Sequence, residues 1–270
     1  MSRKIAINVV YNKWAYEELA ESIKDALISF DFDATVSYAG TVTEDFNIFI
    51  TGKGAPGLDT TNNRVNIFFE TDHIDAVLRQ RAPIDYSIFT RSLHFFDYTR
   101  DLTDQNIYYC PIGYSKHFDT DIPRQDLRPN FHMGRSGNYG HRNQFRGKYD
   151  LWTLPPIVGA ERDEIIVTSK VNINSRMQTL YFFTPLHAAL ILCKGKLYMQ
   201  EELGHDDYNF YKPYLILFDE SDFRSKLDYW VFHDKERHDF EQFVHEDIKK
   251  NHPFEKYLYA AIGDLLEQYR

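Results

Sequence analysis

The stretch KIAINVVYNKWAYEELAESIKDALISFDFDATVSY, residues 4–38, predicts a strand, a helix and a second strand in succession. Residues 4–10 are apolar and rich in branched side chains, which is typical of a strand. Between residues 11 and 30 the apolar side chains keep helical spacing, and residues 33–38 again have a strand pattern. Strands that alternate with helices in this way indicate a parallel sheet covered by helices.

The same alternation continues along the chain. It is interrupted at residues 116–130, a polar segment with two prolines that we interpret as an interdomain linker. Beyond it we expect a helix at 184–195, charged helical segments over 219–251 and a last amphipathic helix from about Pro253. The further strands that we expect are residues 46–54, 64–72, 85–92 and 106–113 before the linker, and 130–134, 164–170, 196–200 and 213–218 after it.

These patterns predict an α/β fold with two Rossmann-like domains that face a cleft, and a C-terminal helix that closes the chain. The expected parts are residues 1–118, a linker at 119–130, residues 131–252 and a helix at 253–270 that can cross back to the N-terminal domain. A cleft between two such domains is a natural place for a small ligand. In parallel sheets ligands bind at the carboxyl ends of the strands.

The composition sets limits on function and location. A net charge of -9 argues against a protein that coats nucleic acid non-specifically, because such binding depends on neutralising phosphates. Cys110 and Cys193 fit no metal or redox spacing, so we expect two buried free thiols. The start of the chain has no signal-peptide pattern, and its apolar runs are too short to cross a bilayer. We therefore expect a cytoplasmic protein without a membrane span.

The stretch FHMGRSGNYGHRNQFRGKYD, residues 131–150, is basic in an otherwise acidic chain. Its glycines at 134, 137 and 140 would let backbone N–H groups approach an anion closely. The alternative is a solvated basic loop, or one that binds the protein's own acidic surface. Between residues 124 and 148 the only acid is Asp126, and the basic residues are Arg124, Arg128, Arg135, Arg142, Arg146 and Lys148.

The second half of the chain resembles the GT-B glycosyltransferases, and among them the CgeB-type group. Four ordered segments carry the resemblance: NFHMGRSGNYGHRN from residue 130, EIIVTSKVNINSR from 164, TPLHAALILCKGKLYMQEE from 184, and residues 211–258. The resemblance implies a nucleotide-sugar donor domain here and an acceptor domain before it. His187 and Leu190 stand where the family's donor helix carries an arginine and a glutamate.

The resemblance directs attention to residues that could hold the donor. Glycosyl transfer needs cationic or backbone donors that stabilise the leaving diphosphate. The loop after residue 133 and the helix start at Thr184, whose free N–H groups attract anions, are the two main candidates. The resemblance suggests that a carboxylate after residue 200 accepts hydrogen bonds from the ribose; a solvated acidic turn is the alternative. The donor-binding candidates are Gly134, Arg135, Ser136, Gly137, Arg142, Lys170, Arg176, Thr184, His187, Glu201 and Glu202.

For the catalytic base we expect a residue of the segment FFETDHID, residues 68–75. Asp72 is the first choice, followed by His73 and Glu70, because all three come at or just past the end of an apolar strand. A plain helix N-cap at Thr71 or Asp72 is the structural alternative, and both can hold together.

The GT-B resemblance implies that no bound metal is needed. We expect no cofactor, because the donor, a UDP- or GDP-sugar, is itself a substrate. The acceptor stays open: a glycan, a protein, a small molecule or modified DNA. One alternative is a phage-type DNA-base glucosyltransferase that acts on hydroxymethylated bases. Another is a catalytically inactive module that binds nucleotide sugars, and a weaker one is a nucleotide hydrolase.

Overall fold

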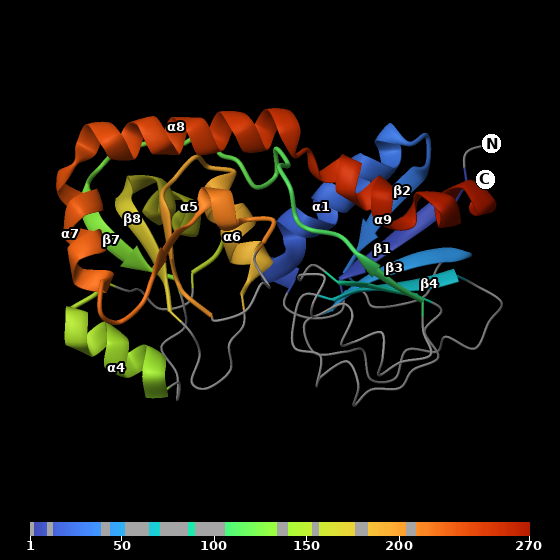
Figure 1. The fold of residues 1–270 in the computed structure, drawn as a ribbon. Coiled ribbons are helices and arrows are strands. Elements are labelled where there is room, and N and C mark those ends of the chain that lie inside the picture. The colour runs from blue at the N-terminus through green and yellow to red at the C-terminus, as the bar shows by residue number, and fades with distance from the viewer. Residues whose placement is uncertain are drawn as a thin grey trace. The chain divides into compact units, whose positions relative to one another are not determined.

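The chain divides into two compact units in the computed structural model, residues Met1–His117 with His252–Arg270 and residues Phe118–Asn251 (Figure 1). The structure describes residues 3–9, 13–38, 44–51, 65–70, 86–89, 106–133, 140–152, 157–175, 183–203 and 209–270. Only the backbone is described for residues 13–15, 51, 68, 70, 86–89, 106, 107 and 140.

The first unit contains a parallel sheet with the strand order β2-β1-β3-β4-β5-β6. All five pairings are parallel, and Ile5 of the inner strand β1 pairs with Ala34 on one side and Phe46 on the other. The parallel sheet predicted for this part of the chain is therefore confirmed. Its strands are β1 (Lys4–Val9), β2 (Asp33–Ser37), β3 (Phe46–Thr51), β4 (Val65–Glu70), β5 (Tyr86–Phe89) and β6 (Asn106–Tyr109).

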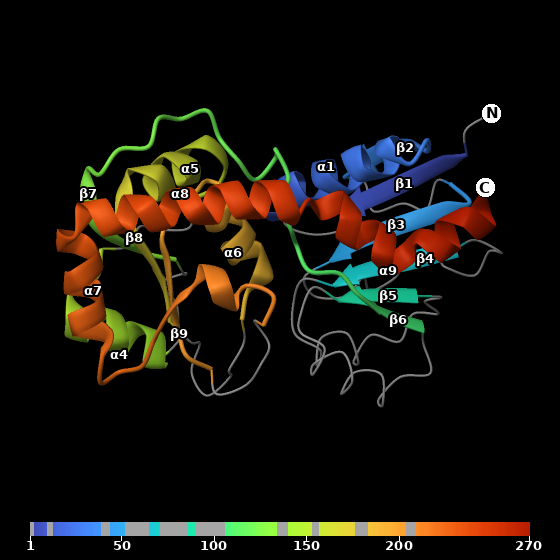
Figure 2. The same ribbon diagram turned by 45° about the horizontal axis from the view of Figure 1, so that its top comes forward.

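Two helices of the first unit come from opposite ends of the sequence. Helix α1 (Lys13–Ser29) buries Leu19, Ile23 and Leu27 completely, as its helical spacing predicts. Helix α9 (Phe254–Tyr269) packs against α1, which Figure 2 shows in red beside blue. Pro253 is the N-cap of α9. The last stretch of the chain therefore completes the core of the first unit.

The second unit contains four parallel strands in the order β10-β9-β8-β7. The strands are β7 (Arg128–His132), β8 (Ser169–Asn174), β9 (Tyr198–Glu201) and β10 (Ile216–Phe218). The helices are α4 (Gly140–Tyr149), α5 (Gly159–Thr168), α6 (Pro185–Leu192), α7 (Phe223–Phe232) and α8 (Asp234–Asn251), with a short 3-10 helix η1 (Lys212–Tyr214).

Helices cover both faces of this second sheet (Figures 1 and 2). On one face Val171 and Ile173 of β8 form a buried cluster with Phe145 of α4 and Phe223 of α7. On the other face the intervening Asn172 donates from Nδ2 to a backbone oxygen of α5, at 3.3 Å. The alternation along β8 therefore places α4 and α7 on one side and α5 on the other.

One strand prediction is wrong. Residues 164–168 are the end of helix α5, and the strand begins only at Ser169. The run Ile165, Ile166, Val167 is buried on all sides, and such a short apolar run cannot be assigned to helix or strand from its periodicity. In addition, β7 begins at Arg128, two residues before the expected strand.

The two cysteines are free thiols and both are buried, as predicted. Burial raises the pKa of the Cys110 thiol far above its usual value. Within the described residues, no helix is long and apolar enough to cross a membrane.

Candidate functional site

Polar side chains gather where the strands of the second sheet end. β7 ends at His132, β8 at Asn174 and β9 at Glu201, and because the strands are parallel these ends share one edge of the sheet. Buried polar groups need hydrogen-bond partners, so a buried cluster of polar side chains indicates a specific hydrogen-bond network or a binding site. The buried polar residues at this edge are His132, Arg142, Asn174, Ser175, Gln200 and Glu201.

Arg142 of α4 is buried at the centre of this cluster. Its Nε and Nη2 donate to the backbone oxygen of Ser175 at 3.1 and 2.8 Å, and Nη2 also donates to Oδ1 of Asn174 at 3.2 Å. The guanidinium therefore holds the carboxyl end of β8 in place, and its positive charge lies inside the cluster.

A chain of amide hydrogen bonds continues from β8 to β9. Asn174 donates from Nδ2 to Oε1 of Gln200 at 2.9 Å, and the two residues are register partners in the sheet. Tyr198 donates its hydroxyl to the same oxygen at 3.3 Å, and Gln200 donates from Nε2 to the backbone oxygen of Glu201 at 2.9 Å. The strand ends are thereby locked to each other.

His132, the last residue of β7, is fully buried. Its Nε2 lies 2.8 Å from the hydroxyl of Ser175, whereas Nδ1 is buried and has no hydrogen-bond partner in the described part of the chain. Burial, and then the positive charges of Arg142 and Arg146, hold the pKa of His132 well below its usual value. The imidazole is therefore neutral at physiological pH.

Arg146 lies one helical turn after Arg142 on α4. Its Nε and Nη1 are buried, and among the described residues neither has a hydrogen-bond partner. Burial lowers the pKa of its guanidinium. Unsatisfied buried donors of a charged group are costly, so they indicate a partner that binds there.

Helix α6 begins near the same groups. Thr184 is its N-cap, but the Thr184 side chain makes no capping hydrogen bond. His187 stands in the first turn, and its Nδ1 is buried without a hydrogen-bond partner among the described residues. Burial, and then the charges of Arg142 and Arg162, lower the pKa of His187 to about 4. A helix start of this kind offers free N–H groups to an anion.

The two carboxylates predicted to contact a ribose differ in their surroundings. Glu201 is buried at the end of β9, and His141 lies with Nε2 3.1 Å from both of its carboxylate oxygens. Glu202 is exposed and contributes its backbone N–H to a bond with Phe218 at 2.7 Å. Of the two, Glu201 is the one that the structure places in the cluster.

The described groups at this edge carry a surplus of positive charge and of unused N–H donors. Arg142 and Arg146 are cationic, and the neutral His132 and His187 add two unsatisfied ring nitrogens. The carboxylate of Glu201 is already paired with His141. Such an arrangement can bind an anion with several oxygens, of which phosphate groups are the usual example.

The other predicted site residues are placed as follows. Glu70 is the last residue of β4, at the carboxyl edge of the first sheet, with only its backbone described. Lys170 lies at the start of β8, at the opposite edge from the cluster, and pairs with Asp234 at 2.8 Å. The structure therefore does not bring Lys170 to the other candidates. The residues that lie outside the described part of the chain are Asp72, His73, Gly134, Arg135, Ser136, Gly137 and Arg176.

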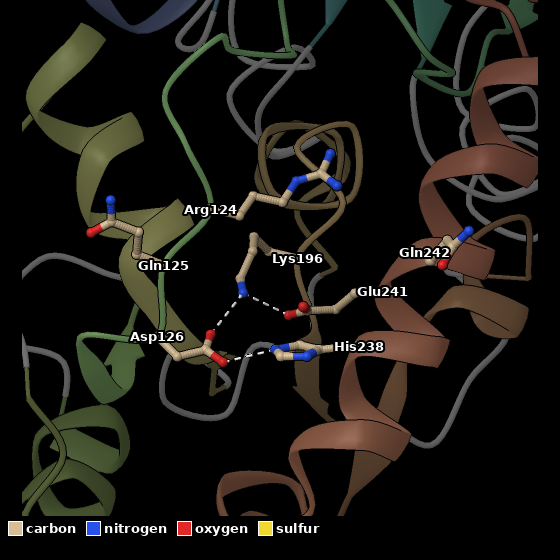
Figure 3. A pocket seen from close by; sticks show the side chains of 7 residues that line it. All are labelled: Arg124, Gln125, Asp126, Lys196, His238, Glu241 and Gln242. Atoms are coloured by element: carbon tan, nitrogen blue, oxygen red, sulfur yellow. Dashed lines mark hydrogen bonds and ion pairs between the residues drawn. The ribbon is translucent and has the colours of Figure 1, made fainter.

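A second polar cluster lies before the strands β7 and β9, and it lines a pocket of about 380 Å³ (Figure 3). Lys196 is buried, with Nζ 2.8 Å from Glu241 and 3.5 Å from Asp126. Arg237, fully buried, and His238 also donate to Asp126. Burial would raise the pKa of Asp126, but the hydrogen bond from His238 and the charges of Lys196 and Arg237 outweigh it and lower that pKa. These charges neutralise one another, in contrast to the first cluster.

We expect the variant Glu241→Gln to lower the free energy of unfolding by about 2 kcal/mol, because a buried ammonium loses its nearest carboxylate. The amide still accepts the bond from the backbone N–H of Leu197, which measures 3.1 Å in the native chain. Chemical denaturation measures the change, with Glu246→Gln on the exposed side of the same helix as the control. An equal effect of both variants would contradict a stabilising role of the Lys196 pair.

Within the described ranges no group of three or more His, Cys, Asp or Glu side chains could hold a metal ion.

No family model matches the chain, and no curated protein matches it in sequence. Solved structures match it over nearly its whole length. An alpha-glucosyltransferase in complex with UDP and DNA containing a HMU base has a TM-score of 0.64 at 10% identity, covering 98% of this chain and 99% of that one. Sucrose-phosphate synthase from Thermosynechococcus elongatus has a TM-score of 0.64 at 9% identity, covering 99% of each chain. An E. coli protein described as trehalose-6-phosphate, bound with UDP-2-fluoro glucose, has a TM-score of 0.59 at 12% identity, covering 97% of this chain and 98% of that one. The chain therefore has the fold of the GT-B glycosyltransferases, with two Rossmann-like units.

Proposed function

We propose that the chain is a glycosyltransferase that moves a sugar from a nucleotide-diphosphate donor to an acceptor hydroxyl. The diphosphate is proposed to bind at the carboxyl edge of the second sheet, between the start of α6 and the arginines of α4. The fold supports the reaction class, and the buried, unsatisfied Nε and Nη1 of Arg146 are the observation that carries the site.

The proposed chemistry places positive charge where the leaving group develops negative charge. In the transfer, the bond between the sugar C1 and the β-phosphate oxygen breaks, and a bond from the acceptor oxygen to C1 forms. Arg142, Arg146 and the N–H groups at the start of α6 would stabilise the departing diphosphate. These cations would take the part that a metal ion plays in other sites, so the proposed enzyme is metal-independent.

Two further assignments remain predictions. Glu201, held by His141, would accept hydrogen bonds from the ribose hydroxyls. The base that removes the acceptor proton stays assigned to Asp72, then His73 and Glu70. We also propose the CgeB-type group as the nearest subfamily, and a cytoplasmic location, which the two buried free thiols support.

UDP-sugars are the first donors to test, because UDP or UDP-2-fluoro glucose is bound in two of the similar structures. We expect Arg146→Gln to weaken UDP-glucose binding about 10- to 100-fold, since a charged donor to phosphate is lost. Isothermal titration calorimetry measures it. Lys148→Gln is the matched control: it removes the same charge from the same helix, but Lys148 is exposed and pairs with Glu220 at 2.6 Å.

Equal affinities of the two variants would contradict the proposed diphosphate site. Turnover is tested separately, by release of UDP from UDP-glucose with and without candidate acceptors. A donor that binds at this site and is never consumed with any acceptor would indicate the alternative of an inactive nucleotide-sugar-binding module.

Modified DNA is the acceptor that a specific observation favours as a second candidate. One similar structure holds DNA containing a HMU base, together with UDP. We propose hydroxymethylated DNA bases as one acceptor to be compared with sugar phosphates and glycans. Transfer of labelled glucose to an oligonucleotide that contains HMU, and not to the same oligonucleotide with thymine, would support it.

A further inference from the structure

Two neutral imidazoles lie among the arginines of the proposed donor site. His132 ends β7 and His187 stands in the first turn of α6, and the Nδ1 atom of each is buried without a hydrogen-bond partner among the described residues. His132 and Arg142 also share Ser175, through its hydroxyl at 2.8 Å and its backbone oxygen at 2.8 Å. The two rings and the arginines therefore belong to one cluster.

Cations face these imidazoles from the packed elements. Arg142 and Arg146 of α4 and the imidazole of His187 on α6 act on His132, and Arg142 of α4 and Arg162 of α5 act on His187. The side chain of Ser175, the residue that follows β8, is uncharged. Protonation of His132 and of His187 is therefore unfavourable as long as the site contains no anion.

The nearby carboxylates are already paired. Asp163 lies 2.8 Å from Arg162 and 3.4 Å from Lys194, and Glu201 lies 3.1 Å from His141. The sequence segments that leave the ends of β7 and β8, residues 134–139 and 176–182, contain two arginines and no acid. The segment that follows β9 in the sequence, residues 204–208, contains His205, Asp206 and Asp207. Among the described residues, Nε and Nη1 of Arg146 and the Nδ1 atoms of the two imidazoles therefore have no carboxylate partner.

A diphosphate that binds at this site would favour protonation of the imidazoles. Its oxygens offer the acceptor that an Nδ1–H group needs, and its charge offsets that of the arginines. A protonated His132 would donate from Nε2 to the hydroxyl of Ser175 and from Nδ1 to a phosphate oxygen, so both ring nitrogens would be satisfied.

We propose that the donor's diphosphate binds together with a proton, which the solvent supplies to His132 or His187, and that the new Nδ1–H group donates to a phosphate oxygen. The proposal rests on the donor site proposed above and adds its proton linkage. The extra charge lies beside the leaving group, where it stabilises the negative charge that develops as the C1–O bond breaks.

Because linkage is reciprocal, a site that takes up a proton with its ligand binds the ligand more tightly at lower pH. Affinity for UDP-glucose is then expected to rise about 3- to 10-fold for each pH unit between about pH 7.5 and about pH 5.5. The rise ends near the pKa of His187 in the ligand-free chain, about 4, below which this imidazole is already charged.

Calorimetric titration with UDP-glucose in buffers of different ionisation enthalpy measures the number of protons taken up per ligand bound. UDP-glucose is the suitable probe because each of its phosphorus atoms carries one ester bond and the shared anhydride bond, so neither has a group that titrates near neutral pH. Any uptake therefore belongs to the protein. At about pH 6 we expect an uptake of about half to one proton per ligand. At least one of His132→Asn and His187→Asn should reduce the uptake, and His233→Asn, at the exposed end of α7, should not.

The outcomes separate this inference from the proposed function. If UDP-glucose binds and the observed heat does not depend on the buffer, the proton linkage is wrong, but the proposed donor site is not contradicted. No binding at all overturns both. If a histidine variant does not fold, the measurement on the native chain still decides, since it needs no substitution.

Discussion

The variant Arg142→Met is expected to abolish detectable UDP-glucose binding and to lower the free energy of unfolding by about 4 kcal/mol. The guanidinium donates two hydrogen bonds to the backbone oxygen of Ser175 and one to Asn174. Methionine fills much of the volume but leaves those buried oxygens without these donors, and it removes the central positive charge of the proposed site.

Chemical denaturation and calorimetric titration measure the two effects. Arg142→Lys is the informative control, because lysine keeps the charge but cannot form the planar fork that reaches both Ser175 and Asn174. We expect it to retain weak binding with an intermediate loss of stability. A methionine variant that binds UDP-glucose like the native chain would contradict the position of the diphosphate.

Comparing the Arg142 and Arg146 variants separates the effect on folding stability from the effect on UDP-glucose binding. Arg142 supports the strand ends, so its loss affects folding and binding together. Arg146 differs, because its Nε and Nη1 have no hydrogen-bond partner among the described residues. We therefore expect Arg146→Gln to weaken binding with little change in stability. Two arginines one turn apart would then have different roles, and only a pair of measurements on each variant can show this.

Much of the fold could be predicted from local patterns. The branched strand at residues 4–10, the helical spacing that follows it and the return to a strand at 33–38 are sufficient for a parallel pair, and the structure has it. The sequence also predicts the final helix from Pro253, since proline is common at the start of a helix and an apolar face follows it. The end of α5 was missed because its run of branched residues is buried in a helix.

The site was harder to predict, because its members come from separate elements. The sequence predicts Arg142, Thr184, His187 and Glu201 for the donor site, but not His132, Arg146, Ser175 or Gln200. One signal was available: Arg142 and Arg146 are four residues apart, so a helix over residues 140–149 places both on one face. Another was Gln200, a polar residue at the end of the apolar run at residues 197–199, which is compatible with a hydrogen-bonding position at the strand end.

Gly113→Ala is expected to lower the stability of the first unit by about 4 kcal/mol or more. A Cβ at this position would lie 2.2 Å from the backbone oxygen of His252. That oxygen accepts a hydrogen bond from Tyr114 at 2.7 Å, and Tyr114 in turn accepts one from Phe254 at 2.8 Å. Because a backbone atom cannot move aside as a side chain can, the variant must separate the two segments.

The consequence reaches the last helix, since these two bonds attach the start of α9 to the segment after β6. Phe254, Leu258 and Leu266 of α9 are buried in the first unit and depend on this attachment. Hydrogen exchange should therefore become faster in peptides from residues 254–269, while peptides from α4 and β8 stay protected, because they belong to the second unit.

Gly147→Ala is the matched control for the same exchange of residues. Its Cβ would meet nothing within 4 Å, and it lies inside helix α4, where alanine is favoured over glycine. We expect this variant to gain about 0.5–1 kcal/mol rather than lose stability. If Gly113→Ala were as stable as Gly147→Ala, the close approach of residue 113 to His252 would be wrong, and with it the attachment of α9 to the first sheet.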